Sequence, residues 1–365
     1  MPRTRVTIRD VAAHAGVSHQ TVSRVINGSE AVRPETRGRV TQAIAELGFR
    51  PDAVARSMAS GRTGYLVCFS PNLTDYTFAS LIDGAEREAR GHGYYLLSSS
   101  APDAETFTAL IDDFIAGGRA EGMMVINPYA DDRHLRLPAD FPTVFAGARP
   151  REEAADSVAL DDVGAARAAT SHLLALGHRR IGLITGPPVE DCTQDRALGY
   201  EHALAEAGLP LDPALIVQGT WLAPSGYDAF GYFMGLAERP TAIFAQNDQM
   251  AVGVLRAARD AGLLLPDELS VIGVDDIPLA AYFAPPLTTV RQDFAAIGRR
   301  AARLLIRAIE DPDAPREHLL LPGELIPRRS TTAAPATNTL NQNAHKEVVP
   351  IQPYSLEPDP ISTQL

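Results

Sequence analysis

The chain has 365 residues, of which 45% are hydrophobic and 21% charged, so it exceeds one small module and has room for two or three globular domains. Its net charge of -12 excludes a general attraction to nucleic acid or to anionic lipid. The charge is unevenly placed: residues 1–62 hold ten arginines and five acidic residues, whereas the other 303 residues hold 23 basic and 40 acidic residues. We therefore expect the N-terminal segment, at +5, to contact a polyanion and the remainder, at -17, to have a different partner.

The two cysteines, Cys68 and Cys192, lie far apart, and neither has a cysteine or histidine at metal-ligand spacing. The sequence therefore predicts no disulfide framework, no structural zinc and no cofactor. The N-terminus lacks the apolar run of a secretion signal, and no segment approaches the roughly eighteen apolar residues of a membrane span. These features favour a cytoplasmic protein without a membrane partner.

Residues 1–49 have the pattern of an all-α head. Hydrophobic side chains recur at i, i+3, i+4 and i+7 over 8–15 and again over 40–47, with a shorter helical segment between them. Residues typical of helix ends mark the boundaries: Thr7 with Asp10 as a capping box, Gly16 as a stop, Ser18 as a second cap and Pro34 as a first helical residue. Three short helices are expected.

Residues 16–29 predict a helix-turn-helix. Gly-Val-Ser forms a tight turn, and the second helix turns Val22, Val25 and Ile26 inward. In such a unit the second helix enters the major groove, where Gln20 suits adenine and Arg24 suits guanine or a phosphate. The alternative is an ordinary amphipathic helix pair with a solvated polar face. The side chains off the buried face are His19, Gln20, Thr21, Ser23, Arg24 and Asn27.

Residues 50–62 are expected to form a hinge and linker. Pro51 ends the preceding helix, 52–59 are compatible with a helix, and Ser60-Gly61 stops it. Eight residues do not hold a helix alone in water, so a helix here needs something to pack against. The alternative is a passive linker.

From residue 63 the sequence alternates short β-rich apolar runs with amphipathic helices, which is typical of parallel sheets. The expected strands are 65–70, 94–100, 122–127, 142–148, 157–162, 180–186, 241–248 and 269–276, and the expected helices lie near 79–92, 105–116, 163–176, 195–207 and 294–309. We predict an effector-binding domain over 63–330 with two doubly wound subdomains, about 63–160 with 291–320 and about 161–290 with 321–330. A ligand cleft is expected between them. Residues 331–365 lack an apolar period and predict a disordered tail.

The sequence resembles the bacterial lactose and galactose repressor family. The likeness runs through TIRDVAAHAGVSHQTVSRVING (7–28), RPETRGRVTQAIAELGFRP (33–51), LGHRRIGLITGP (176–187) and PTAIFAQNDQMAVGVLRAARDAGL (240–263). The resemblance implies a homodimeric repressor that binds double-stranded operator DNA of pseudo-palindromic sequence. It also implies an α/β body, similar to a periplasmic sugar-binding protein, that takes a small effector between its subdomains and then releases the DNA.

The resemblance extends to residues of the effector site. It implies that Arg196, Asn247 and Asp275 hydrogen-bond sugar hydroxyls. The only tryptophan, Trp221, matches a ring stacked on a pyranose face, and Phe294 matches a second cleft-lining ring. The effector is therefore expected to be a carbohydrate, such as a galactoside or another glycoside, although Trp221 and Asp275 also fit a core ring and an interdomain ion pair. At the mouth of the cleft we expect Asp161, with Asp162 as the alternative. The resemblance over residues 120–130 is ambiguous by one residue, so either Ile126 or Asn127 is expected to line the cleft.

For the head, the resemblance implies a hinge helix that orders on DNA and pushes an apolar side chain into a minor-groove base step. Met58 stands at that position, where leucine is usual, and a thioether can still act as the wedge. Asp52 is a second departure, because it brings negative charge near phosphates. The complete set of expected DNA contacts is Thr7, Ser18, His19, Gln20, Thr21, Ser23, Arg24, Asn27, Thr36, Ala55 and Met58.

Other functional classes fit less well. The sequence has no phosphate-binding loop, dinucleotide fingerprint, serine-hydrolase elbow or HExxH helix, so we expect neither catalysis nor a metal site. His172 and His178 are expected to be surface or capping groups. A transport-type sugar-binding protein would need an export signal and no basic head. A purine-type or global regulator, or an activator, whose ligand promotes DNA binding stays open as the alternative.

Overall fold

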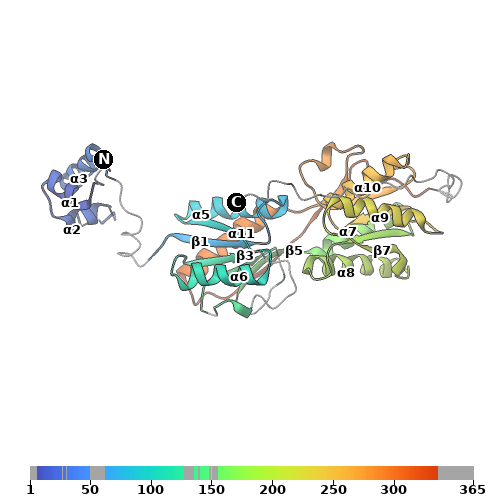
Figure 1. Cartoon of the computed structure of the whole chain (residues 1–365), viewed down its shortest axis with the longest axis horizontal. Helices are drawn as coiled ribbons and strands as arrows, with labels where there is room; N and C mark the ends of the chain where they lie inside the picture. The colour runs from blue at the N-terminus through green and yellow to red at the C-terminus, as the bar shows by residue number, and fades with distance from the viewer. Residues whose placement is uncertain are drawn as a thin grey trace, which may run out of the picture.

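The computed structural model describes residues 6–26, 28, 29, 31–49, 62–126, 135–138, 140–147, 149 and 155–335. They form a three-helix head and two α/β units, the N-unit and the C-unit, each built on its own six-stranded sheet (Figure 1). Within these residues no helix is both long and apolar enough to cross a bilayer. The expected hinge helix at 52–59 lies outside the described residues.

The head consists of α1 (Ile8–Ala15), α2 (His19–Ile26) and α3 (Pro34–Leu47). Its helix ends are those predicted: Thr7 and Asp10 form a capping box, and Gly16 ends α1 in the left-handed conformation at φ 62°. Val11, Val22 and Val40, one from each helix, are completely buried and form the centre of the core. This confirms the predicted all-α head with its helix-turn-helix.

The N-unit has a parallel sheet in the order β11-β5-β4-β3-β1-β2. Its strands are β1 (Tyr65–Ser70), β2 (Tyr95–Ser100), β3 (Gly122–Val125), β4 (Thr143–Ala146), β5 (Asp156–Leu160) and β11 (His318–Leu321). Its helices are α5 (Tyr76–Gly91), α6 (Ala104–Ile111), which continues as one π turn to Ala116, and α11 (Phe294–Glu310). Helices α5 and α11 cover one face of the sheet and α6 the other (Figure 1).

The C-unit repeats this design with the order β12-β10-β9-β8-β6-β7, in which only β12 is antiparallel to its neighbour. Its strands are β6 (Ile181–Thr185), β7 (Ile216–Gln218), β8 (Ala242–Ala245), β9 (Ser270–Asp275), β10 (Thr288–Arg291) and β12 (Glu324–Ile326). Its helices are α7 (Asp162–Ala175), α8 (Asp191–Glu206), α9 (Ala223–Gly235) and α10 (Asp248–Asp260), with short 3₁₀ turns at Pro213–Leu215 and Ala280–Tyr282. Helices α9 and α10 pack on one face, and α7 and α8 on the other.

The chain passes between the two units three times. It crosses from β5 to α7, from β10 to α11 and from β11 to β12, and at most two residues separate the elements at each crossing. Each unit is therefore assembled from segments far apart in the sequence. The two sheets place the carboxyl ends of several strands around the junction, which is where ligands bind in doubly wound folds.

Close helix packing in both units depends on glycine. In the C-unit, Gly226 of α9 faces the backbone of Met250 in α10, and an ideal Cβ on Gly226 would lie 2.7 Å from the carbonyl carbon of Met250 and nearer still to its oxygen. In the N-unit, a Cβ on Gly298 of α11 would lie 2.9 Å from the carbonyl carbon of Leu81 in α5. Each helix pair therefore packs with backbone against backbone at these positions.

Residues 331–335, which the composition assigned to a disordered tail, continue the C-unit. The amide of Ala334 donates to the carbonyl of Leu176 at 2.8 Å, and Thr331 lies 3.0 Å from His172 Nε2. His178 is 1% exposed and bonds to Thr241, Ser270 and the carbonyl of Thr332, so the expectation of a surface histidine was wrong. Hydrogen bonds to polar side chains and backbone groups of the C-unit fix this segment in place, so its lack of an apolar period did not indicate disorder. The rest of the predicted tail, 336–365, lies outside the described residues.

Candidate DNA interface and ligand cavity

Helix α2 presents a polar edge. His19, Gln20 and Arg24 are exposed, Thr21 and Ser23 are half-buried, and Val22 beneath them is fully buried. The side chain of Ser18 accepts a hydrogen bond from the amide of Thr21 at 3.2 Å, so it caps α2 as its sequence position predicted. An exposed amide and an exposed guanidinium four residues apart share one face of the helix. Asn27 lies outside the described residues.

The remaining predicted DNA contacts divide into two groups. Thr7 is exposed, but its hydroxyl lies 2.7 Å from Asp10 Oδ2 within the capping box of α1, so part of its bonding capacity serves the helix. Thr36 is half-buried in the first turn of α3. Ala55 and Met58 lie outside the described residues, so the predicted wedge remains a prediction.

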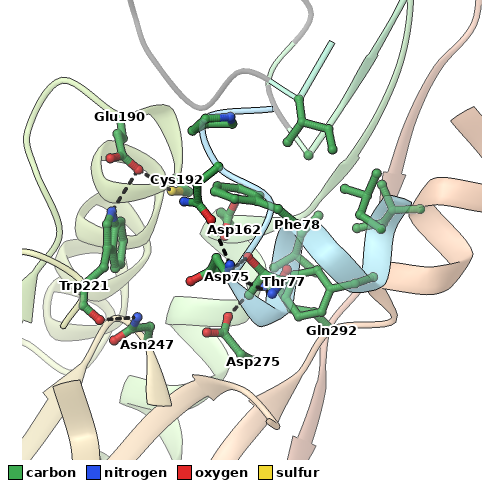
Figure 2. A pocket seen from close by; sticks show the side chains of 18 of the residues that line it. Asp75, Thr77, Phe78, Asp162, Glu190, Cys192, Trp221, Asn247, Asp275 and Gln292 are labelled. Carbon is green, nitrogen blue, oxygen red and sulfur yellow. Dashed lines mark hydrogen bonds between the residues drawn. The ribbon is translucent and has the colours of Figure 1, made fainter. Parts of the chain in front are cut away.

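A cavity of about 310 Å³ lies at the junction of the two units. Figure 2 shows side chains from both units pointing into it, with Asp75, Thr77 and Phe78 from the N-unit facing Trp221, Asn247 and Asp275 from the C-unit. The other polar and sulfur-bearing side chains in its wall are Asn72, Asp162, Glu190, Cys192, Arg196, Thr220 and Gln292. The apolar part of the wall includes Leu81, Ile126, Leu160, Phe294 and Ile297.

Arg196, on α8, is the central cation of the described wall. Its Nε donates to Asp162 Oδ1 at 2.6 Å, and its Nη1 donates to the backbone carbonyl of Gln246 and lies 4.0 Å from Asp275 Oδ1. The residue is only 6% exposed, so the single positive charge of a buried guanidinium lies between two carboxyl groups. The arrangement fixes the positions of oxygen atoms around the ligand space.

Trp221 forms an aromatic side of the cavity and is held at three places. Its indole Nε1 donates to Glu190 Oε2 at 2.9 Å, its carbonyl accepts from Asn247 Nδ2 at 2.9 Å, and the guanidinium carbon of Arg196 lies 5.8 Å from its ring centroid. A Cβ on Gly186 would overlap the indole ring, so the absence of a side chain there makes room for it. The backbone of Trp221 has a φ of 68°, in the left-handed region that non-glycine residues rarely adopt. The contacts on its ring and carbonyl stabilise this unfavourable conformation.

The carboxyl groups of the wall are strongly affected by burial. Burial raises the pKa of Asp275 well above its ordinary range, and the Arg196 charge opposes the increase. Burial also raises the pKa of Asp162, again against the effect of Arg196, and raises the pKa of Glu190 against the hydrogen bond from Trp221. Asp275 has a φ of 119°, so two of the three described non-glycine residues with positive φ line the cavity.

The cavity brings together most of the residues expected from the sequence. Arg196, Trp221, Asn247, Asp275 and Phe294 all line it. At the mouth, Asp162 and not Asp161 contributes to the wall, because the Asp161 carboxylate accepts from the amide of Gly164 at 2.8 Å and caps α7. Ile126 lines the cavity, whereas Asn127 lies outside the described residues. The sequence reading missed Asn72, Asp75, Thr77, Thr220, Glu190, Cys192 and Gln292.

Two polar links join the units beside the cavity. Gln249 Nε2 in α10 donates to Asp75 Oδ2 at 3.2 Å, and Arg149 Nε after β4 donates to Asp195 Oδ2 in α8 at 2.7 Å, with a second contact between the same two side chains. Both links depend on the relative placement of the two sheets. A ligand that changes this placement therefore changes these contacts. Among the described residues, no group of histidine, cysteine, aspartate and glutamate side chains forms a metal site.

Comparison with known proteins agrees with this architecture. Residues 7–52 match the family described as bacterial regulatory proteins, lacI family, and residues 170–331 match a periplasmic binding protein-like domain. Catabolite control protein A of Priestia megaterium is 34% identical over 330 residues, which cover 89% of this chain and 99% of that protein.

Solved structures agree as well. The Lac repressor dimer bound to operator and the anti-inducer ONPF has a TM-score of 0.83 at 29% identity and covers 90% of this chain and 100% of that one. The complex of the transcriptional regulator CelR with cellobiose has a TM-score of 0.69 at 32% identity and covers 89% and 100%. The head, the paired sheets and a relative of this identity along nearly the whole length lead to one conclusion: the chain belongs to the lacI family of bacterial regulatory proteins.

Proposed function

We propose that the protein is a cytoplasmic transcriptional repressor, without catalytic activity, whose homodimer binds a pseudo-palindromic operator through its two α2 helices. The observation that carries this proposal is the exposed polar edge of α2, with Gln20 and Arg24 one turn apart above the buried Val22. An amide and a guanidinium at such spacing suit bidentate contacts with base edges. A homodimer would place the two helices in successive major grooves.

We further propose that a small sugar binds the cavity and releases the operator. Planar polar groups on Arg196, Asn247 and Asp275 suit ring hydroxyls, and the Trp221 ring suits the C–H face of a pyranose. The cellobiose bound to CelR supports a glycoside of this kind. Because Asp75–Gln249 and Arg149–Asp195 link the units across the cleft, ligand binding would act on their relative placement.

The DNA proposal is tested by selecting operators from random duplex DNA with the full chain, then measuring affinity by fluorescence anisotropy at several salt concentrations. A palindrome with a central CG step is expected, with salt-sensitive binding. Gln20→Ala should change the base preferred at one position of each half-site, and Arg24→Ala should weaken binding by about 1–3 kcal/mol. Gln42→Ala, which removes an exposed amide from α3, is the matched control and should change neither. Failure to enrich any sequence would contradict the proposal.

The sugar proposal is tested by calorimetry with mono- and disaccharides, including cellobiose and galactosides, on wild type and Trp221→Ala. Loss of the stacking contact in Trp221→Ala should make the binding free energy of the sugar less favourable by about 1 kcal/mol or more. The same sugar, added to the protein–DNA complex, should lower DNA affinity. If it raises DNA affinity, the ligand acts as a co-repressor or activating ligand, and the release step proposed here is wrong.

A further inference from the structure

The described wall of the ligand cavity is rich in carboxyl groups. It contains the carboxyl groups of Asp75, Asp162, Glu190 and Asp275, and among the described residues only one basic side chain, Arg196, lines it. Figure 2 shows Asp75 and Asp275 from opposite units facing the same space, with Glu190 beside Trp221. Burial raises the pKa of Glu190 and of Asp275, and neighbouring carboxylates, Asp75 among them, raise both further. These groups therefore act on one another within a single space.

The guanidinium of Arg196 is already committed to the protein. It donates to Asp162 and to the carbonyl of Gln246, lies 4.0 Å from Asp275, and is almost fully buried. Its single positive charge is matched by the Asp162 carboxylate alone, and Asp275 adds a second carboxyl group beside it. Asp75 and Glu190 remain as carboxyl groups whose hydrogen-bond partners, Thr77, Gln249, Trp221 and Cys192, carry no charge, although the Arg196 charge lowers the pKa of Glu190 in part.

The amide side chains of the wall add few donors. Asn247 gives one hydrogen to the carbonyl of Trp221, and its oxygen caps α10 through the amide of Met250. Gln292 donates to Asp275 at 3.3 Å. An ionised carboxylate is only an acceptor, with about four lone-pair positions. Asn72 accepts through its oxygen from the amides of Thr74 and Asp75, so its NH2 group and the Thr220 hydroxyl are the further donors of the wall. Four carboxyl groups outweigh these donors, so ligand hydroxyl groups that donate suit this wall, whereas a phosphate or carboxylate on the ligand would bring only more acceptors.

We propose that this cavity selects uncharged, polyhydroxylated ligands and excludes their anionic counterparts, with Asp75 and Glu190 as the residues that determine this specificity. The inference rests on the proposed role of the cavity as the effector site, and it names the class of effector. Two like charges about 5 Å apart at an effective dielectric constant of about 20 repel enough to weaken binding by more than about 100-fold. Sugar phosphates and uronates should therefore bind at least about 100-fold more weakly than the parent sugar.

The first test needs no known ligand, because Trp221 is the only tryptophan and its ring lies in the cavity wall. Fluorescence quenching of the full chain is measured with iodide, caesium and uncharged acrylamide at constant low ionic strength. A local potential of one kT changes the concentration of each ion about threefold, so caesium should quench several-fold better than iodide after normalisation to free tryptophan. Equal quenching by the two ions would overturn the proposal.

Glu190→Gln is the deciding variant, because a glutamine oxygen can still accept the hydrogen bond from the indole while the charge is removed. It should raise the iodide-to-caesium ratio by about twofold or more and leave acrylamide quenching unchanged. Glu206→Gln removes the same charge from the exposed end of α8, away from the cavity, and should leave the ratio unchanged. An unchanged ratio in Glu190→Gln would overturn the assigned role of this residue.

The second test compares ligands by calorimetry, pairing glucose and galactose with glucose 6-phosphate, glucuronate, galacturonate and glucosamine, and including cellobiose. Binding of every anionic member at least about 100-fold more weakly than its uncharged parent supports the proposal. An anionic member that binds as tightly as its uncharged parent, or more tightly, overturns it, whereas glucosamine, whose protonated amine is a cation and a donor, should bind at least as tightly as glucose. If no sugar binds, the proposed sugar-effector function fails, and the quenching experiment still decides the charge selection independently.

Discussion

A single methyl group added at Gly226 should separate α9 from α10. An ideal Cβ there would lie 2.7 Å from the carbonyl carbon of Met250 and nearer to its oxygen, against about 3.5 Å for ordinary contacts, so the helices must move apart by roughly 1 Å. Both opposing atoms belong to helix backbone, which cannot rotate away as a side chain would. Overpacking of this kind costs about 1–3 kcal/mol.

Gly231→Ala is the matched control, because Gly231 lies in the same helix and an ideal Cβ on it meets no atom within 4 Å. Alanine should stabilise the helix there by about 0.5–1 kcal/mol, and the same gain applies to Gly226→Ala. Their difference therefore isolates the contact with Met250, and it should be about 1–3 kcal/mol. The more destabilised protein is expected to be Gly226→Ala.

Urea unfolding of both full-length variants measures this difference. Trp221 is the only tryptophan and lies two residues before Ala223, the first residue of α9, so its fluorescence reports on the C-unit, with far-ultraviolet circular dichroism as the second probe. Equal midpoints for the two variants would refute the backbone contact between α9 and α10. A loss in Gly231→Ala would refute the assumption that this position is open.

Three further changes test other parts of the molecule. Val22→Ala should destabilise the head by about 1.5–3 kcal/mol, because it removes two buried methyl groups from the small core under α2. Thermal unfolding followed by far-ultraviolet circular dichroism measures this, and an unchanged midpoint for the transition of the head would contradict it. Burial raises the pKa of Asp248 to about 7 from 3.8, so the folded chain binds more protons than the unfolded chain between these values. The free energy of unfolding should then fall as pH rises from about 4 to 7, by at most about 1.4 kcal/mol per pH unit. In Asp248→Asn, urea unfolding at several pH values should show a smaller fall of this free energy with pH than in the wild type. The same pH dependence in both proteins would rule out the raised pKa of Asp248. Arg149→Ala should weaken ligand binding up to about fivefold, since a half-exposed ion pair contributes about 1 kcal/mol or less. Adding Asp195→Ala should cause no further loss in calorimetry, whereas fully additive losses would show that the two side chains act separately.

The sequence predicted the head well because its signals are local. The capping box at Thr7, the stop at Gly16 and the first-turn Pro34 each depend on residues within one helical turn, and the structure places helix ends at all three. The alternation of the body also predicted two parallel sheets. Helix α9 was not predicted, because it contains Pro224 and Gly226, residues that usually interrupt helices. Strands β7 and β12, with three residues each, are too short to show a period.

The candidate site was predicted in part. Residues matched by the family resemblance reached the cavity, whereas Asp75, Glu190 and Gln292 did not stand out in the sequence. Asp75 reads as an ordinary helix cap, which it also is, and Gln292 lies in a crossing between the sheets that no local pattern reveals. His178 is comparable, since its burial depends on Thr332, 154 residues away. Such contacts are set by topology, so a residue's neighbours in sequence do not predict them.

The order in which the chain crosses between its units has a consequence for synthesis on the ribosome. Helix α11 covers one face of the first sheet, and β11 pairs with β5, yet both follow nearly the whole second unit in the sequence. While residues up to 290 are being made, the apolar face that later packs against Phe294, Ile297 and Leu305 stays uncovered, and β5 has an open edge. Exposed apolar faces and strand edges favour aggregation. The first sheet is therefore open to such contacts during synthesis until residues 294–321 have emerged and folded onto it.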